Sequence, residues 1–374
     1  MSTVTAALIV RDEARVIGEC LASLVGRVDQ IVVVDTGSID DTREIVRDYP
    51  AELHRFDWCG DFAAARNHAL DRARSAWILY IDADERLSIS DDALPRLLSD
   101  AGKVAWKLRL QPRVGWTAYS ELRLFRNDPR IRFEGVIHET IWPGVNAVAS
   151  ADGLDVGICD LTLRHVGYEA DQRPKNPRNM PLLEQRLARD PDNFFCWWHL
   201  GDCQRLAGDA TAAITTWSTG LARLRARGTP PPGLAESLLH VALLNLRRER
   251  GEPLDDLLDE ALAWFPDNWE VHFINARVLT DRGEFESARP ILERLLAIEP
   301  DTFFEPQLAY DAGLFGHLSA ELLALGHFRS GRFAEAARLY RTAALSSPAP
   351  EACRLKAQLA ELRAAGARPA TPSG

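Results

Sequence analysis

The sequence predicts an α/β domain with a mostly parallel sheet, followed by an all-α domain of helical repeats. Residues 1 to about 110 alternate short apolar runs with helical patterns. Strands that are apolar throughout, with helices between them, are typical of a parallel sheet covered on both faces. Further along, Pro266 and Pro300 each follow an apolar helical pattern and lie 34 residues apart, which indicates a repeat. A chain of 374 residues is long enough for two cores.

The elements of the first half follow from these patterns. We expect strands at Val4–Val10, Ile31–Val34, Ala51–Phe56 and Trp77–Ile81, and helices at Glu13–Leu24, Asp41–Asp48 and Phe62–Ala73. From about residue 104 to 166 the pattern changes to strands and loops, in the segments "VAWKLRLQ", "ELRLFRN", "VIHETIW" and "DLTLRHV". These segments predict a mixed extension of the sheet.

The second half resembles tetratricopeptide repeats. Trp197, Leu200 and Gly201 match the W-x-x-L-G opening of such a repeat, and Ala276 and Ala288 occupy the small-residue positions of another. We expect about four helix pairs, with insertions near Thr229–Gly233 and Phe303–Tyr310. The predicted domains are 1–168 (α/β), 169–181 (a proline-containing linker), 182–366 (repeats) and 367–374 (a flexible tail).

Composition limits the partners and the compartment. The net charge of −10 argues against binding nucleic acid, because the phosphate backbone would repel the chain. No apolar run reaches the ~20 residues that cross a bilayer, and the start lacks the basic region of a signal peptide. The six cysteines form no C-x-x-C pair. We therefore expect a cytoplasmic protein with no membrane span.

Acidic residues follow two of the predicted strands. Asp35 ends one, and Asp82-Ala83-Asp84 follows another. Ligands of parallel sheets bind at the carboxyl ends of strands, where Asp35 can accept hydrogen bonds from a base or a ribose. In an extended segment, residues two apart project to the same side, so Asp82 and Asp84 suit a hard divalent cation that contacts phosphate oxygens. The pattern predicts a nucleotide-diphosphate site with a metal.

Four segments resemble glycosyltransferase family 2, which has the GT-A nucleotide-sugar-binding fold. They are "ALIVRDEARVIGECLASL", "VVVDTGSIDDT", "AAARNHAL" and "YIDADE", which come in the family's order between residues 4 and 87. "RLFRN" and "FEGVIHE" resemble further motifs of one branch of the family. The resemblance implies that Asp35 binds the nucleoside, Asp82 the ribose or a metal-bound water, and Asp84 the Mg²⁺ or Mn²⁺ ion. The nucleotide-sugar-binding set that it implies is Val10, Glu13, Asp35, Arg66, Asp82 and Ala83.

Three assignments remain open between alternatives. The family's usual E-D dipeptide is missing, and "VIHETIW" lies where it is expected, so Glu139 is the candidate base and His138 the alternative. Adjacent residues of a strand point to opposite faces, so only one of them should enter the site. His165 is either a third ligand of the metal or a histidine packed at a strand end. Arg66 either faces the donor or pairs with an acid on its own helix.

The resulting hypothesis is an inverting, metal-dependent glycosyltransferase. The donor is a nucleotide-diphosphate sugar, taken as a UDP-sugar, and the acceptor is a Cys, Ser or Thr side chain of a peptide or protein bound with help from the repeats, because solenoids form concave surfaces suited to peptides. One alternative is extension of a glycan or lipopolysaccharide core. Another is a non-catalytic repeat scaffold. A homodimer is compatible with either enzyme hypothesis.

Overall fold

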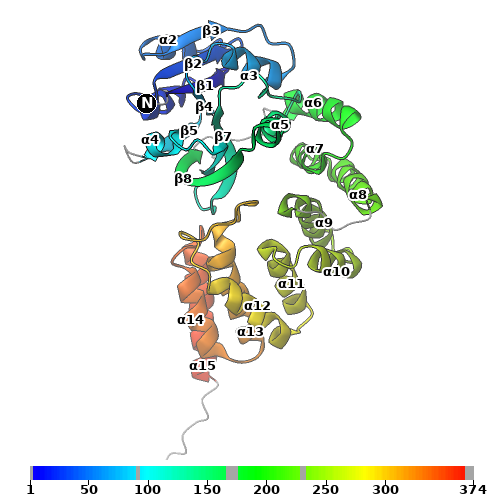
Figure 1. Ribbon diagram of the computed structural model, residues 1–374. Coiled ribbons are helices and arrows are strands. Elements are labelled where there is room, and N and C mark those ends of the chain that lie inside the picture. Colours follow the sequence, from blue (N-terminus) through cyan, green and yellow to red (C-terminus); the bar gives the residue numbers. More distant parts are fainter. Residues whose placement is uncertain (1–2, 90–92, 166–175, 228–232, 367–374) are drawn as a thin grey trace, which may run out of the picture. The chain divides into compact units, whose positions relative to one another are not determined.

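The computed structural model describes residues 3–89, 93–165, 176–227 and 233–366 (Figure 1). The chain divides into two compact units. The first comprises residues 1–114 and 118–216, and the second comprises residues 115–117 and 217–374. No helix among the described residues is long and apolar enough to cross a membrane.

The first unit is built on an eight-stranded sheet of order β3-β2-β1-β4-β7-β6-β8-β5. The strands β1 (Val4–Val10), β2 (Gln30–Asp35), β3 (Glu52–Arg55) and β4 (Trp77–Tyr80) run parallel. The other four form a mixed extension. They are β5 (Glu85–Ser88), β6 (Lys103–Gln111), β7 (Tyr119–Arg126) and β8 (Asp155–His165). The predicted α/β class, the parallel part and the mixed extension are therefore all present.

Helices cover both faces of this sheet, and alternate strand residues supply the two cores. One core contains Leu8, Val33 and Leu79 together with side chains of α1 (Ile17–Leu24), α2 (Thr42–Arg47) and α4 (Ala93–Leu98). The other contains Ala7, Val32 and Ile78 together with side chains of α3 (Phe62–Leu70) and α5 (Trp142–Asp152). Because both faces are buried there, β1, β2 and β4 are mostly apolar, which is the pattern that predicted them, whereas the edge strand β3 is mostly polar.

One predicted strand was wrong. The segment "VIHETIW" forms a turn, closed by an isolated antiparallel bridge between Glu134 and Thr140, and leads directly into α5. The backbone explains this, because Gly135 (φ +104°) and His138 (φ +48°) both have left-handed conformations that a strand does not accommodate. We call residues 134–140 the Glu139 turn. The sequence patterns also missed α5 and the short strand β5.

Two helices beyond the sheet belong to the same compact unit. They are α6 (Asn176–Arg189) and α7 (Phe194–Leu206). Most of the predicted linker lies outside the described residues, and residues 176–181 form the first turns of α6. The predicted domain limits and the tail at 367–374, which also lies outside the described residues, stay predictions.

The next helix is α8 (Ala210–Ala226), which contains the boundary between the two units. In the second unit the helices pack in pairs, as the repeat pattern predicted (Figure 1). The pairs are α9–α10 (Ser237–Glu249 and Asp255–Trp264), α11–α12 (Trp269–Asp281 and Phe285–Leu296) and α13–α14 (His317–Arg329 and Phe333–Ala343), followed by α15 (Pro350–Gly366). Small residues such as Ala276, Ala288 and Ala336 are completely buried in the core of the second unit. The predicted insertion near 303–310 is present, and the one near 229–233 lies almost entirely outside the described residues.

Candidate active site

The carboxyl ends of β1 and β2 form the first part of the site. Val10 and Asp35 are register partners there, and the Thr36 backbone N–H donates to the Val10 carbonyl. Asp35 is only 2% exposed, and its carboxylate accepts hydrogen bonds from the Gly37 and Ser38 N–H groups. Gly37 has φ +111°, which a residue with a side chain rarely adopts. Asp35 therefore builds the turn at the end of β2 as well as facing the strand end.

Glu13 lies beside this turn because the segment before α1 is a loop. The predicted helix from Glu13 begins only at Ile17. The N–H groups of Asp12 and Ala14 donate to the side chains of Ser38 and Asp40 in the β2–α2 loop, and that of Glu13 donates to Thr42, the first residue of α2. Asp12 also has a left-handed backbone (φ +57°). These bonds to the neighbouring loop replace the helical ones and hold Glu13 next to the end of β2.

Asp82 follows β4 and is held by two arginines. Arg66 Nη2 of α3 donates to Asp82 Oδ1 at 2.7 Å, and Arg123 Nη1 of β7 lies 3.6 Å from Oδ2. Burial alone would raise the pKa of Asp82, but the two guanidinium charges outweigh it and hold that pKa well below its ordinary value. Asp82 is therefore a carboxylate over the whole ordinary pH range.

Arg123 and Glu85 form a buried ion pair that the sequence patterns did not single out. Arg123 Nη2 donates to Glu85 Oε1 at 2.8 Å, and the Asp82 N–H donates to Glu85 Oε2 at 2.9 Å. The Arg123 and Glu85 side chains are 5% and 0% exposed. Burial raises the pKa of Glu85 above its ordinary value, and the positive charge of Arg123 opposes this rise. Glu85 thus fixes the backbone of the D-x-D segment. The "RLFRN" motif was the available signal for Arg123.

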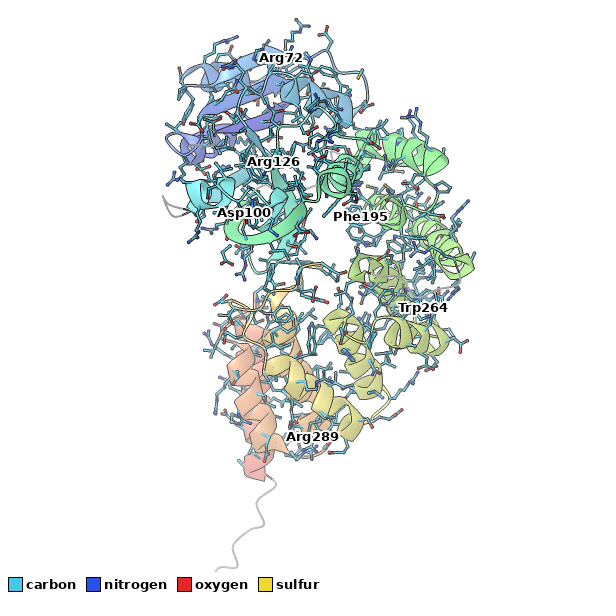
Figure 2. The ribbon with its side chains drawn as sticks, in the orientation of Figure 1. Arg72, Asp100, Arg126, Phe195, Trp264 and Arg289 are labelled. Carbon is cyan, nitrogen blue, oxygen red and sulfur yellow. The ribbon has the colours of Figure 1, made fainter. Side chains whose placement is uncertain are left out.

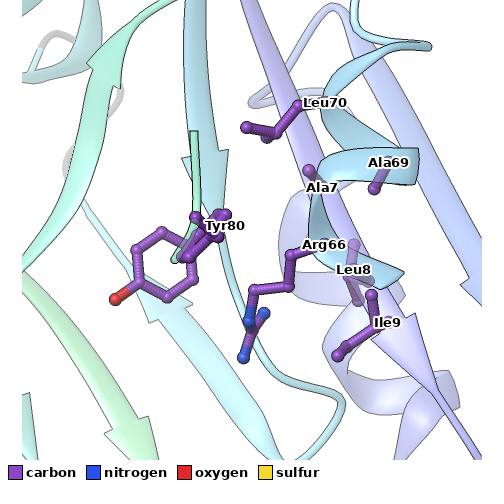
Figure 3. A pocket seen from close by; sticks show the side chains of 8 residues that line it. Ala7, Leu8, Ile9, Arg66, Ala69, Leu70 and Tyr80 are labelled. Carbon is purple, nitrogen blue, oxygen red and sulfur yellow. The ribbon is translucent and has the colours of Figure 1, made fainter. Parts of the chain in front are cut away.

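Both arginines pack on the ring of Tyr80. The Arg66 guanidinium lies 5.0 Å from the ring centroid, and that of Arg123 lies 4.4 Å from it. Figure 3 shows Arg66 of α3 extending toward Tyr80 of β4, beside β1. Arg66 is also 5.5 Å from the Phe133 ring. An aromatic face attracts a guanidinium, so these rings hold the two cations next to the acidic groups at the strand end.

Glu139 enters the same network. Arg66 Nε donates to Glu139 Oε1 at 2.5 Å, so Arg66 bridges the predicted base and Asp82. The acidic partners of Arg66 therefore lie on other segments of the chain and not on α3 itself. His138 points elsewhere: its Nε2 lies 2.5 Å from Nδ1 of His199 on α7. The structure therefore brings Arg66, Asp82 and Glu139 together and leaves His138 outside this group.

Asp84 and His165 form a second pair. His165 Nε2 lies 3.3 Å from Asp84 Oδ2, and both side chains are mostly buried. Strand β8 pairs antiparallel with β5, and the register Glu85–His165 brings His165 beside the D-x-D segment. Ala83, between the two acids, is buried in the core. Among the described residues, no group of three or more His, Cys, Asp or Glu side chains is arranged to hold a metal. A carboxylate and an imidazole still fit a divalent ion whose other ligands come from a diphosphate.

A mostly parallel sheet with acids at the carboxyl ends of its central strands defines a nucleotide-binding α/β enzyme. Residues 5–106 match the model of glycosyl transferase family 2, and residues 256–309 match that of the tetratricopeptide repeat. A TPR repeat-containing protein of Synechococcus elongatus is 34% identical over 315 residues, which cover 80% of this chain and 76% of that protein. The chain therefore belongs to the family of this TPR repeat-containing protein, and it carries a glycosyl transferase family 2 domain at residues 5–106.

Other relatives agree with this assignment. The glycosyltransferase SunS of Bacillus phage SPbeta is 29% identical over 211 residues, 51% of this chain and 46% of SunS. The lipopolysaccharide core biosynthesis glycosyltransferase LpsC of Rhizobium meliloti is 32% identical over 158 residues, 38% of this chain and 58% of LpsC. The predicted branch is therefore confirmed, and the chain is a glycosyltransferase.

Solved structures show a distant likeness. Glucosyl-3-phosphoglycerate synthase from Mycobacterium tuberculosis, in complex with Mn²⁺, UDP and glucosyl-3-phosphoglycerate, is 15% identical with a TM-score of 0.37. The match covers 50% of this chain and 80% of that chain.

Proposed function

We propose that the protein is an inverting, divalent-metal-dependent glycosyltransferase that moves a sugar from a UDP-sugar to a Cys, Ser or Thr side chain of a peptide or protein. One observation carries this proposal: Arg66 joins Glu139 to Asp82 at the carboxyl end of β4, and the Asp84–His165 pair lies next along the chain. A carboxylate for the acceptor and a metal-binding pair for the diphosphate are what an inverting transfer needs.

The donor half of the proposal rests on Asp35 and on the Asp84–His165 pair. Asp35 would bind the nucleoside beside Val10 and Glu13 at the ends of β1 and β2. Asp84 and His165 would hold Mg²⁺ or Mn²⁺, which when bound supplies positive charge to the leaving diphosphate. Asp82 stays ionised between Arg66 and Arg123 and would accept a hydrogen bond from the ribose.

The acceptor half rests on Glu139. In an inverting transfer the acceptor attacks the anomeric carbon on the face opposite the diphosphate. The bond to the diphosphate oxygen breaks as the new glycosidic bond forms, and the acceptor's proton must go to a base. Glu139 is such a base, oriented by Arg66 Nε. His138, whose imidazole is bonded to that of His199, is not oriented toward this group.

A peptide acceptor is favoured by the presence of the repeats and by the similarity to SunS. The similarity to LpsC supports the alternative, in which a glycan or lipopolysaccharide core is extended. Incubating candidate peptides and core oligosaccharides with several UDP-sugars separates the two. A mass increase of one sugar on peptides alone supports the first function, and an increase on oligosaccharides alone supports the second.

The metal assignment is tested by Asp84→Ala. We expect nearly complete loss of transfer, and loss of the Mn²⁺ dependence of UDP binding measured by calorimetry, with the same unfolding midpoint. The matched control is Asp160→Ala, an exposed acid on β8, which should leave both unchanged. Wild-type turnover of Asp84→Ala after treatment with a chelator would refute the metal assignment.

The base is tested by Glu139→Gln on two kinds of acceptor. A hydroxyl needs a base, which is typically worth ~10²–10⁴-fold in rate, whereas a thiol ionises with an ordinary pKa of ~8.5. Transfer to serine or threonine should therefore fall steeply, and transfer to cysteine less, with unchanged donor binding. Equal activity of Glu139→Gln and wild type on a hydroxyl acceptor would exclude Glu139 and leave His138 to be tested.

A further inference from the structure

The Glu139 turn rests on the helix pair α6–α7 as well as on the sheet domain. Val136 and Ile137 are buried in one apolar cluster with Leu183 and Leu187 of α6 and with side chains of α7. On the other side, the Phe62 N–H at the start of α3 donates to the Val136 carbonyl at 3.0 Å. The turn that carries Glu139 is therefore clamped between α3, which supplies Arg66, and the first helix pair.

His199 holds the most constrained residue of this turn. His138 has φ +48°, which costs free energy for a residue with a side chain and persists only where the surroundings enforce it. Its Nε2 lies 2.5 Å from His199 Nδ1, so one imidazole donates to the other. Burial lowers the pKa of both, that of His138 to about 3, so the pair is neutral near pH 7. The ring of Phe195, labelled on α7 in Figure 2, packs edge-on against His138.

Arg186 of α6 lies against Gly135, the second left-handed residue of the Glu139 turn. Gly135 has φ +104°, and a Cβ at this position would collide with the Arg186 guanidinium. The side chain of Arg186 is mostly buried, and its Nη2 lies 3.6 Å from Oδ2 of Asp190, the residue that follows α6. Both left-handed residues of the Glu139 turn thus have an α6 or α7 side chain against them.

We propose that α6 and α7 position the transferase centre, by which we mean Arg66, Asp82, Glu85, Arg123 and Glu139. Through its hydrogen bond to His138, His199 holds the left-handed turn that aims Glu139 at Arg66. The inference rests on the proposed role of Glu139. Glu139 directly follows His138, so a rotation of the His138 backbone moves its carboxylate. A displacement of about 1 Å at a catalytic group can cost ~10²-fold in rate.

The first experiment compares His199→Ala with His199→Asn in the full chain. In His199→Ala, kcat for a hydroxyl acceptor should fall by ~10²-fold with the donor KM unchanged. His199→Asn places an amide near the position of Nδ1 and should recover most of the loss. The control is His240→Ala, because His240 is a completely buried histidine that lies on α9 in the second unit. Loss of kcat in that control, or no loss in His199→Ala, overturns the proposal.

The second experiment separates this proposal from that of the base. If His199 acts through Glu139, the double variant His199→Ala/Glu139→Gln should be no slower than Glu139→Gln alone, whereas independent effects would multiply. Should Glu139→Gln prove fully active, the base assignment fails. Amide exchange of residues 135–139 then still decides: faster exchange in His199→Ala than in His240→Ala supports positioning, and equal exchange refutes it.

Discussion

The transferase centre and the repeats use charged residues in opposite ways. In the centre, Arg123 and Glu85 are an ion pair that is almost completely buried, and Arg66 joins two carboxylates while it packs on aromatic rings. In the repeats, pairs such as Arg341–Glu361, with side chains 62% and 43% exposed, lie in solvent. The core there is apolar, with alanines where the helices approach one another.

This difference indicates which charged residues are candidates for a role in the reaction. Taking charges out of water is expensive, and a buried pair often stabilises a fold no better than apolar residues would. Exposed ion pairs cost little free energy of desolvation and contribute little to the free energy of unfolding. Four acids lie around two arginines, namely Asp82, Glu85, Glu121 and Glu139, and they are therefore better explained by the proposed reaction than by stability.

The largest effect on stability is expected at Arg123. Arg123→Ala removes the counter-charge of the buried Glu85 and leaves Asp82 with Arg66 alone, so it should lower the free energy of unfolding by about 3–5 kcal/mol. Arg123→Lys keeps the charge but not the planar fork and should lose less. Urea unfolding at pH 7 measures both. A loss below about 1 kcal/mol for Arg123→Ala would mean that the buried network is relaxed by water.

A smaller, pH-dependent effect is expected at His138. Its pKa is lowered by burial, by His199 and by Arg186 from 6.5 to about 3, so its neutral form stabilises the fold. This contribution is complete above pH 6.5 and is lost as the pH falls from 6.5 toward 3. Between pH 7 and 5 the wild type should lose about 2 kcal/mol through this group.

The variant for this measurement is His138→Asn, because asparagine tolerates a left-handed backbone and does not titrate. Its free energy of unfolding should change less between pH 7 and 5 than that of the wild type. Parallel pH curves for the two proteins would show that His138 does not remain neutral in the fold.

The next effect on stability is expected at Gly135, and Gly153 is its matched control. Both have left-handed backbones, but a Cβ would meet Arg186 at Gly135 and nothing within 4 Å at Gly153. Gly153→Ala should cost about 1–2 kcal/mol for the backbone alone and leave transfer unchanged. Gly135→Ala should cost more and slow transfer as well. Equal losses of stability at the two sites would show that the contact with Arg186 is unimportant.

The smallest effect is expected in the repeats. Arg341→Ala removes an exposed ion pair with Glu361 and should change the free energy of unfolding by about 0.2–1 kcal/mol. Adding 0.5 M salt should abolish even this difference, because salt screens exposed charges. A loss comparable to that of Arg123→Ala would remove the contrast between the two regions.

Local pattern predicted part of the candidate site. Asp35, Asp82 and Asp84 were predicted because each lies at or just after the end of an apolar strand, and parallel strands present their carboxyl ends together. The Glu139 turn was misread as a strand, because "VIHETIW" has strand-like composition and the left-handed angle at His138 leaves no mark in the sequence. Glu85 was missed as a site residue, because its partner Arg123 lies 38 positions away.

The sequence by itself determined the fold class, the repeats, the family and the acids at the strand ends, since all of these depend on spacing within short segments. Only the tertiary structure decided which charges meet: Arg66 with Asp82 and Glu139, Arg123 with Glu85, and His138 with His199. These pairs join residues from separate elements, and burial makes their interactions strong. Neither the contact nor the loss of solvent is encoded locally, because both arise from packing the whole chain.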